Sequence, residues 1–179
     1  MSFREYNGLA LVNIGNEVLD KWKKDRAFEK SLELREGAPE FIFFEGPPSA
    51  NGMPGIHHVM ARSIKDAICR YKTQSGYKVR RRAGWDTHGL PVELGVEKKL
   101  GITKEDIGSK ISVEEYNATC RSEVMKYTAE WRKLTERIGY WVDMDDPYIT
   151  YDNRYIETLW YLLKDIYGKG YLYKGKSIQ

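Results

Sequence analysis

The sequence predicts an α/β protein in which a Rossmann-like parallel sheet carries helices on its faces. Residues 41–44 form a continuous apolar run before a loop rich in Gly and Pro, which favours a strand buried on both faces. A helical segment follows, and residues 77–83 favour a second strand. Strand, helix and strand in this order form a crossover unit whose ligands bind beyond the carboxyl ends of the strands.

The composition fits a globular protein and excludes few functions. A chain of 179 residues can bury a core, and a net charge of +3 is too small to indicate nucleic acid binding on its own. Cys69 and Cys120 lie far apart within helical patterns, which predicts free thiols in a reducing cytosol. No apolar run reaches the length of a membrane span, and the start has no signal-peptide core. We therefore expect a cytoplasmic protein with no membrane partner.

The chain is expected to have two regions. Residues 1–40 are interpreted as a helical arm and connector, and residues 41–179 as the start of a Rossmann-like domain. Within the arm, a helix over about residues 16–28 would pack one apolar face, made by Val18, Leu19 and Trp22. The polar segment 33–40 contains Gly37 and Pro39 and predicts a connector.

The helix after the Gly- and Pro-rich loop has two different sides. Its apolar residues recur at helical spacing, at Ile56, Met60, Ile64, Ile68 and Tyr71. Its other side carries charge, at Arg62, Lys65, Asp66 and Arg70. Gly76 is a suitable stop for this helix.

The second half of the chain predicts further helices. Residues 91–100 favour a short helix, and Ser112 with Glu115 forms a capping box that opens a long one. The long helix carries a core-packing stripe at Val113, Tyr116, Cys120, Val124, Tyr127, Trp131, Leu134 and Ile138.

The last segments alternate turns with regular structure. Residues 143–147 indicate a turn, and Asp152 can cap a final helix that ends near residues 168–170. Residues 171–173 favour one more strand.

The loop after the first predicted strand is suited to a nucleotide and an ammonium group. Pro47 and Pro48 have no N–H, so this segment presents carbonyl oxygens, which bind an α-ammonium group. Gly52 and Gly55 allow the backbone to approach a base or a phosphate closely.

Two histidines follow at the amino end of the next helix. There the helix dipole favours anions and disfavours imidazolium, so His57 and His58 are expected to be neutral and to donate N–H groups to phosphate oxygens. The alternative interpretation is a tight strand-to-helix turn with two incidental histidines.

Asp86 follows the end of the second predicted strand, so its carboxylate should face the same crevice. It could pair with an ammonium group, with Mg²⁺, or with the N–H groups of its own turn. His88 is a weaker candidate, since it can simply pack beside Leu90 and Pro91.

The two loops together resemble the class I aminoacyl-tRNA synthetases, in the isoleucine-specific branch rather than its valine or leucine relatives. The resemblance covers nearly the whole chain. It rests on Gly46-Pro47-Pro48-x-Ala50-Asn51-Gly52, on Gly84-Trp85-Asp86-x-His88-Gly89-Leu90-Pro91-x-Glu93, and on Arg137-Ile138-Gly139-Tyr140-Trp141-Val142-Asp143.

The resemblance implies roles for individual residues. The phosphate signature of the family is His-x-Gly-His, and the aligned residues here are Gly55, Ile56, His57 and His58. His58 matches the last histidine, whereas His57 would compensate for the missing first one, so both are implied to be catalytic. ATP binding is assigned to Asn51, Gly52, Gly55, His57 and His58, and binding of the amino acid to Gly46, Pro47 and Asp86.

The implied reaction is the ATP-dependent activation of isoleucine, followed by transfer of the acyl group to the isoleucine tRNA. Mg²⁺ is expected on the ATP phosphates and not on a protein ligand. The second, lysine-rich ATP signature of the family is absent from the sequence. We therefore expect the first half of a class I catalytic domain, truncated before the editing insertion and inactive alone.

Two other functions stay open. One is a non-catalytic nucleotide- or RNA-binding module derived from such a fold, and the other is a nucleotidyltransferase without an amino acid pocket. Asp86 with the two prolines favours the amino acid enzyme, because an adenylyltransferase alone needs no ammonium site.

Overall fold

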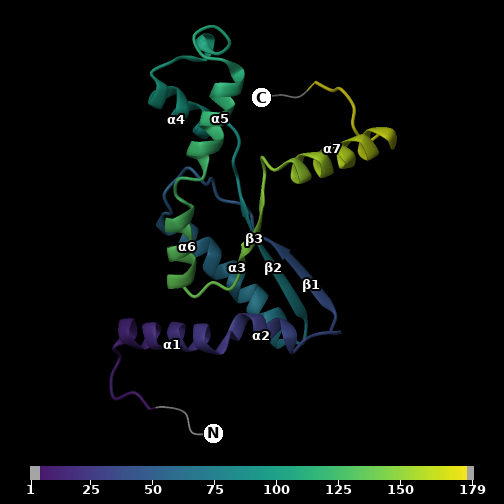
Figure 1. Ribbon diagram of the computed structural model, residues 1–179. Coiled ribbons are helices and arrows are strands. Elements are labelled where there is room, and N and C mark those ends of the chain that lie inside the picture. Colours follow the sequence, from purple (N-terminus) through teal and green to yellow (C-terminus); the bar gives the residue numbers. More distant parts are fainter. Residues whose placement is uncertain (1–4, 177–179) are drawn as a thin grey trace. The chain divides into compact units, whose positions relative to one another are not determined.

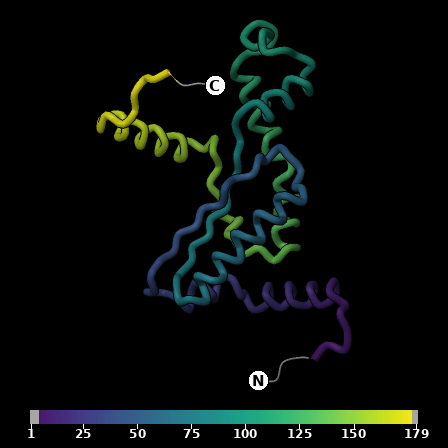
Figure 2. The backbone as a smooth tube through the Cα atoms, turned by 180° about the vertical axis from the view of Figure 1, so that it is seen from behind, coloured from purple at the N-terminus to yellow at the C-terminus, as the bar shows by residue number. Residues whose placement is uncertain are grey.

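The computed structural model describes residues 5–176, and the chain forms two compact units. Unit 1 comprises Met1–Phe43, Pro54–Arg81 and Glu130–Val142, and unit 2 comprises Phe44–Met53, Arg82–Ala129 and Asp143–Gln179. Each unit therefore combines segments that lie far apart in the sequence, as the course of the backbone in Figure 2 illustrates. The predicted boundary after residue 40 stays a prediction.

The structure confirms the α/β class. Three strands form one sheet in the order β1 (Glu40–Phe44), β2 (Lys78–Trp85) and β3 (Asp143–Ile149) (Figure 1). Strands β2 and β3 are parallel, with Gly84 opposite Tyr148 and an irregular register between Arg82 and Gly84.

The prediction that the first strand is buried on both faces is wrong. Exposure alternates along β1, and Ile42 and Phe44 keep 59% and 57% of their surface accessible. The strand lies at the edge of the sheet, and among the described residues only one of its faces is packed. An uninterrupted apolar run cannot reveal which face will be covered, because it lacks the alternation that marks a half-buried strand.

The predicted turn at residues 143–147 is instead the first part of β3. A turn-like feature does occur there, because Asp143 Oδ1 accepts hydrogen bonds from the backbone N–H groups of Asp145 (2.9 Å) and Asp146 (3.3 Å). Pro147 is tolerated because β3 is an edge strand, where one row of N–H groups has no ladder partner. Asp143 thus makes the local hydrogen bonds of a turn, but the segment forms a strand because it pairs with β2.

The amino-terminal helix is broken in two. Helix α1 (Leu11–Asp25) ends at Arg26, whose φ of 51° places it in the left-handed region, and α2 (Ala27–Glu33) follows directly. The prediction of one helix over residues 16–28 was therefore wrong in its bounds. Its apolar face is confirmed, since Val18, Leu19 and Trp22 are half-buried, and turns replace helix after residue 33.

Helix α3 (Ile56–Gln74) is confirmed, but its packing is the reverse of what the apolar spacing suggests. Its buried residues are Arg62, Cys69 and Thr73. The five apolar residues of the predicted stripe are all more than half exposed, namely Ile56, Met60, Ile64, Ile68 and Tyr71. The polar side of α3 therefore faces the interior of unit 1.

A network of paired charges explains how this polar side can be buried. The Arg81 side chain, 1% exposed, bonds Asp66 Oδ1 through Nη1 at 3.1 Å and donates from Nη2 to Thr73 Oγ1 at 2.9 Å. Arg70 bonds the other oxygen of Asp66 at 2.5 Å and lies 3.9 Å from the ring centre of Trp141. Buried charges need partners of this kind, because a charge removed from water is otherwise strongly destabilising.

The predicted long helix is two helices. After α4 (Leu90–Leu100) and the 3₁₀ turn η1 (Lys104–Asp106), α5 spans Val113–Val124 and α6 spans Thr128–Arg137. Ser112 caps α5 as predicted, accepting from the Glu115 N–H at 3.1 Å. The core interpretation of the stripe is largely confirmed, because Tyr116, Val124 and Trp131 are buried, although Val113 is exposed.

The final helix, α7 (Asn153–Gly168), begins as predicted, with Asp152 accepting from the Arg154 N–H at 2.9 Å. The predicted strand at residues 171–173 is wrong, because residues 171–176 have no regular structure. An alternating aromatic pattern cannot form a strand without a neighbour to pair with. Across residues 5–176, no helix combines the length and the apolar character needed to cross a bilayer.

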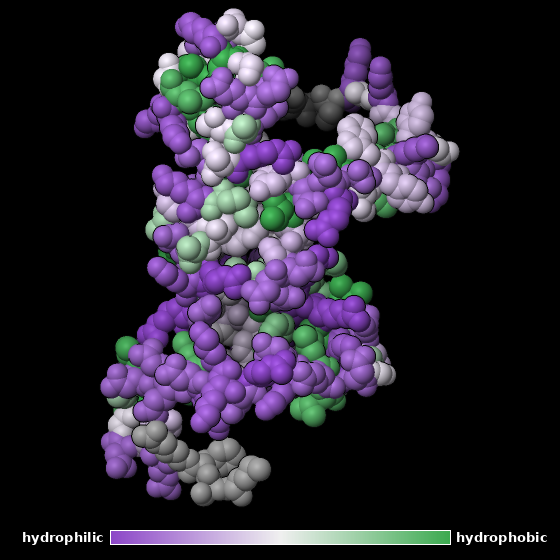
Figure 3. Space-filling view, in the orientation of Figure 1, coloured by the Kyte–Doolittle hydropathy of each residue, from purple (hydrophilic) through white to green (hydrophobic). Residues whose placement is uncertain are grey.

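Apolar side chains also reach the surface of the molecule, where they lie among polar ones (Figure 3). Helix α7 is a clear case, since Trp160, Tyr161 and Tyr167 are each more than 65% exposed.

Gly84 gives a test of the sheet packing in unit 2. A Cβ at this position would lie 2.3 Å from Cζ and 2.4 Å from Cε1 of Tyr148. We expect Gly84→Ala to lower the free energy of unfolding by about 1–3 kcal/mol through overpacking, measured by urea denaturation. The matched control is Gly95→Ala in α4, where nothing lies within 4 Å, and which should stabilise by about 0.5–1 kcal/mol. Equal effects of the two substitutions would contradict this packing.

Candidate functional site

The predicted site residues fall in both units. Unit 2 holds Gly46, Pro47, Asn51, Gly52 and Asp86, whereas unit 1 holds Gly55, His57 and His58.

The loop of unit 2 starts from a firmly held residue, Glu45, which is 2% exposed. Its backbone N–H donates to the Arg82 carbonyl at 2.9 Å, and its own carbonyl accepts a hydrogen bond from the Tyr148 hydroxyl. The sheet therefore fixes the direction in which residues 46–49 leave β1.

Asp86 holds the same loop through its backbone. Its N–H donates to the Pro48 carbonyl at 3.0 Å, and its carbonyl accepts from the Ala50 N–H at 3.1 Å. Ala50 is fully buried and accepts in turn from the Tyr127 N–H at 3.3 Å. Asp86 therefore lies beside the loop that carries Gly46 and Pro47, and the role of these three residues in binding an ammonium group stays a prediction.

The Asp86 carboxylate is half-buried, and its Oδ1 accepts a 3.3 Å hydrogen bond from the His88 N–H. This is the turn interaction that the sequence left open. Among residues 5–176 we find no other partner for this carboxylate and no hydrogen bond to the carbonyls of Gly46 or Pro47, so these oxygens can accept from a ligand. The Pro48 carbonyl is different, since the Asp86 N–H uses it.

A buried threonine, Thr87, and the half-buried Thr150 anchor the turn that follows Asp86. Thr87 is 6% exposed, its N–H donates to Thr150 Oγ1 at 3.0 Å, and the two hydroxyls are 2.8 Å apart. The Tyr151 N–H also donates to the Thr87 hydroxyl at 3.0 Å. His88 is exposed, which does not support the packed histidine that the sequence suggested.

Asn51 and Gly52 lie in a turn at the end of the loop. The Gly52 N–H donates to the Ser49 carbonyl at 3.2 Å, and the Asn51 side-chain amide donates to the Pro91 carbonyl at 2.9 Å. Asn51 also lines a small pocket of about 180 Å³ with residues of α4 and α5. Their role in ATP binding stays a prediction.

In unit 1, His58 closes the amino end of α3. Gly55 is the N-cap, and its N–H donates to His58 Nδ1 at 2.9 Å. A neutral imidazole has one donor and one acceptor nitrogen, so acceptance at Nδ1 places the ring proton on Nε2. In this tautomer the Nε2–H is the donor of the ring, and the predicted donation to a phosphate stays a prediction.

The surroundings of His58 keep it neutral. Burial lowers the pKa of this imidazole, and the neighbouring groups His57, Arg62 and Lys65 lower it further. The sequence had attributed the neutral state to the helix dipole alone. Sequence analysis did not identify Arg62 as a neighbour of His58. Nor did it identify Trp131, whose ring meets the His58 ring edge-on with the ring centres 4.6 Å apart. The spacing of four residues between His58 and Arg62 was the available signal.

The His57 ring lies over Gly55. A Cβ at Gly55 would be 3.0 Å from Cε1 and 3.1 Å from Nδ1 of His57, closer than nearly all real Cβ contacts. The ring centres of His57 and His58 are 3.8 Å apart. The two departures from the signature are thus linked, because the His57 imidazole occupies the space into which a side chain at position 55 would project.

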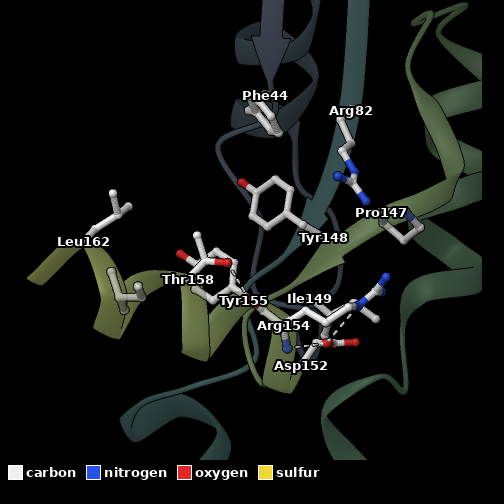
Figure 4. A pocket seen from close by; sticks show the side chains of 11 residues that line it. Phe44, Arg82, Pro147, Tyr148, Ile149, Asp152, Arg154, Tyr155, Thr158 and Leu162 are labelled. Carbon is white, nitrogen blue, oxygen red and sulfur yellow. Dashed lines mark hydrogen bonds and ion pairs between the residues drawn. The ribbon is translucent and has the colours of Figure 1, made fainter. Parts of the chain in front are cut away.

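A larger pocket, of about 580 Å³, lies in unit 2 between the end of β3 and α7 (Figure 4). The rings of Tyr148 and Tyr155 are stacked at 5.9 Å, and Phe44 meets Tyr148 edge-on at 6.0 Å. None of the predicted site residues lines this pocket.

The fold and these motifs agree with the comparison to known families. Residues 17–179 match the family described as tRNA synthetases class I (I, L, M and V). The chain therefore belongs to the class I tRNA synthetases.

Three of the similar curated proteins carry the name isoleucine–tRNA ligase. The chain is 71% identical over 177 residues to the isoleucine–tRNA ligase of Porphyromonas gingivalis. The aligned region comprises 99% of this chain and 16% of that protein. The isoleucine–tRNA ligase of Bacteroides fragilis is 70% identical with the same coverage. That of Cytophaga hutchinsonii is 62% identical over 94% of the chain and 15% of its own length. The chain thus spans about 16% of the length of these relatives.

A solved structure supports the fold. The LeuRS of Agrobacterium radiobacter, crystallised as a ternary complex with tRNA and LeuAMS, superposes with a TM-score of 0.59. The superposed region comprises 91% of this chain and 18% of the LeuRS chain, and the two sequences are 21% identical.

The neutral state of His58 predicts a pH dependence of stability. Because the folded pKa lies below the unfolded value of about 6.5, the contribution of this residue is complete above that pH. This contribution to stability is lost as the pH falls from about 6.5 towards the folded pKa, because the unfolded state then binds a proton that the folded state does not. Glutamine at this helix position can cap the same N–H without titrating. We expect His58→Gln to gain stability relative to the unchanged protein on acidification, measured by urea denaturation at several pH values. A difference that does not change with pH would contradict the assignment.

Proposed function

We propose that the full-length protein activates isoleucine with ATP and transfers it to the isoleucine tRNA. The observation that carries this proposal is the backbone pairing of Asp86 with Pro48 and Ala50, which holds this acidic residue beside the loop that follows β1 and carries Gly46 and Pro47. High identity to proteins named isoleucine–tRNA ligase supports it.

The proposed ammonium site has three parts. The Asp86 carboxylate supplies the negative charge, and the carbonyls of Gly46 and Pro47 supply neutral acceptors. The Pro47 ring, which is half-buried, is proposed to contact the aliphatic side chain of the amino acid. A positioned amino acid presents its carboxylate to the α-phosphorus of ATP, which gives isoleucyl-adenylate and pyrophosphate without a protein nucleophile.

The proposed phosphate site is the amino end of α3. His58 donates from Nε2, and His57 supplies the second imidazole in place of the histidine that position 55 lacks. Asn51, Gly52 and Gly55 are proposed to contact the nucleotide. Donors held in place before the reaction stabilise the charge that develops on the phosphates.

We propose that Mg²⁺ enters with the nucleotide, bound to its phosphate oxygens. Within residues 5–176, no three His, Cys, Asp or Glu side chains are grouped so as to hold an ion, so no residue is assigned to the metal. The cytoplasm is proposed as the location, which suits the free thiols of Cys69 and Cys120.

Asp86→Asn tests the ammonium site in the full-length protein. The change keeps the size and the turn geometry but removes the charge, so it should weaken isoleucine much more than ATP. Losing one partner of a charged hydrogen bond costs about 1.5–3 kcal/mol, or roughly 10- to 150-fold in the KM for isoleucine. Pyrophosphate exchange measures both KM values. Equal losses for the two substrates would assign Asp86 to the turn or to the nucleotide instead.

The two histidines are tested in the same assay. Loss of one preorganised donor should cost about 2–4 kcal/mol in adenylate formation for His58→Ala, and His57→Ala should impair the same step. If His57 takes the place of the first signature histidine, Gly55→His with His57→Gly should restore activity that either single change removes. A silent His57→Ala would leave His58 as the single acting histidine, and normal exchange by His58→Ala would refute its role. His88→Ala is the matched control, since His88 is exposed and has no assigned role.

A further inference from the structure

Arg62 is a buried cation one helical turn after His58. Only 4% of its surface is accessible, although arginine is among the residues that are seldom fully buried. Its guanidinium carbon lies 4.8 Å from the ring centre of Trp131 and 5.5 Å from that of Tyr140. Its Nη1 donates to the Thr135 hydroxyl. The guanidinium is thus held in one place by residues of α6 and the segment after it.

Helix α6 connects Arg62 to His58 through Trp131. The Thr135 hydroxyl donates to the Trp131 carbonyl at 2.7 Å, so the partner of Arg62 is tied to the backbone of Trp131. Trp131 is 1% exposed and meets the His58 ring at 4.6 Å, with 74° between the ring planes. Edge-to-face contacts of this kind have a preferred geometry. Arg62, Trp131 and His58 therefore form one continuous packed series within unit 1.

The groups found to oppose protonation of His58 lie on its own helix. His57, Arg62 and Lys65 each oppose protonation of the His58 ring, and burial does so more strongly. Helix α6 meets the ring with the uncharged Trp131, and the loop before α3 meets it with the Gly55 N–H. Protonation of Nδ1 would break the bond to Gly55, because a protonated nitrogen cannot accept.

We propose that Arg62 is a positioning residue for His58. By packing against Trp131 and by its charge, it keeps the imidazole neutral, with Nδ1 on the Gly55 N–H and Nε2–H directed to a ligand. The catalytic consequence rests on the proposed function of His58, whereas the effect on the imidazole itself does not.

The test is Arg62→Met in the full-length protein, since methionine keeps an unbranched apolar stem beside Trp131 but removes the guanidinium and its charge. Deuterium exchange at Cε1 of each histidine, followed by mass spectrometry over a pH series, gives the titration midpoint of His58. We expect the midpoint to move to higher pH. The kcat of pyrophosphate exchange should fall by about tenfold, within the range for a misplaced catalytic group, with the KM for isoleucine unchanged.

Arg70→Met is the matched control. Arg70 lies on the same helix and packs on aromatic rings in the same way, at 3.9 Å from Trp141 and 4.8 Å from Trp22. It should lower the unfolding temperature without moving the His58 midpoint. Arg62→Lys retains the charge, so its midpoint should stay near that of the unchanged protein, and this variant covers the case in which Arg62→Met does not fold.

Three outcomes separate the inference from the proposed function. A shifted midpoint together with slower exchange supports both. A shifted midpoint with normal exchange supports the positioning of His58 but removes its role in catalysis. A midpoint that stays in place in Arg62→Met, or that moves equally in Arg70→Met or in Arg62→Lys, overturns the inference, because Arg62 would then have only a structural role.

Discussion

The arrangement of unit 2 depends on the backbone of one residue, Asp86. Its N–H and carbonyl bond Pro48 and Ala50, so the two loops that follow β1 and β2 are joined before any side chain is considered. Backbone pairing of this kind tolerates little displacement, because an unpaired buried peptide group is costly. The backbone of Asp86 is consequently fixed beside the segment that leaves β1, and the buried Thr87, whose N–H donates to Thr150 Oγ1, holds the next residue in place.

Local signals determined part of the fold, and pairing determined the rest. The caps at Ser112 and Asp152 could be found from sequence, because each depends on a side chain and an N–H a few residues away. Strand β3 could not, because its Asp and Pro residues indicate a turn until β2 is present to pair with it. Likewise, apolar spacing gave the helix α3 but not its orientation, since the burial of Arg62 and Asp66 depends on partners distant in sequence.

For the candidate site, the sequence identified the residues but not their surroundings. His58 and Asp86 could be chosen because they follow strand ends in a recognisable motif. That Nδ1 of His58 accepts from Gly55, and that Trp131 lies against its ring, could not be read from the chain. Trp131 was interpreted as core, which is correct, yet the same side chain also bounds the site. Trp131 therefore belongs to the core of unit 1 and also contacts a candidate site residue.

At the proposed phosphate site, the contact between His57 and Gly55 has a consequence for inhibitors that compete with ATP. In a protein with the usual signature, a histidine side chain rises from the first position and a bare backbone follows at the third. Here the bare backbone comes first, at Gly55, and the imidazole reaches it from the third position. A compound shaped to fit the usual signature would clash with the His57 ring, because that signature has no side chain at the third position. The exchange of two residues therefore offers a structural basis for selectivity between this proposed site and one with the usual signature.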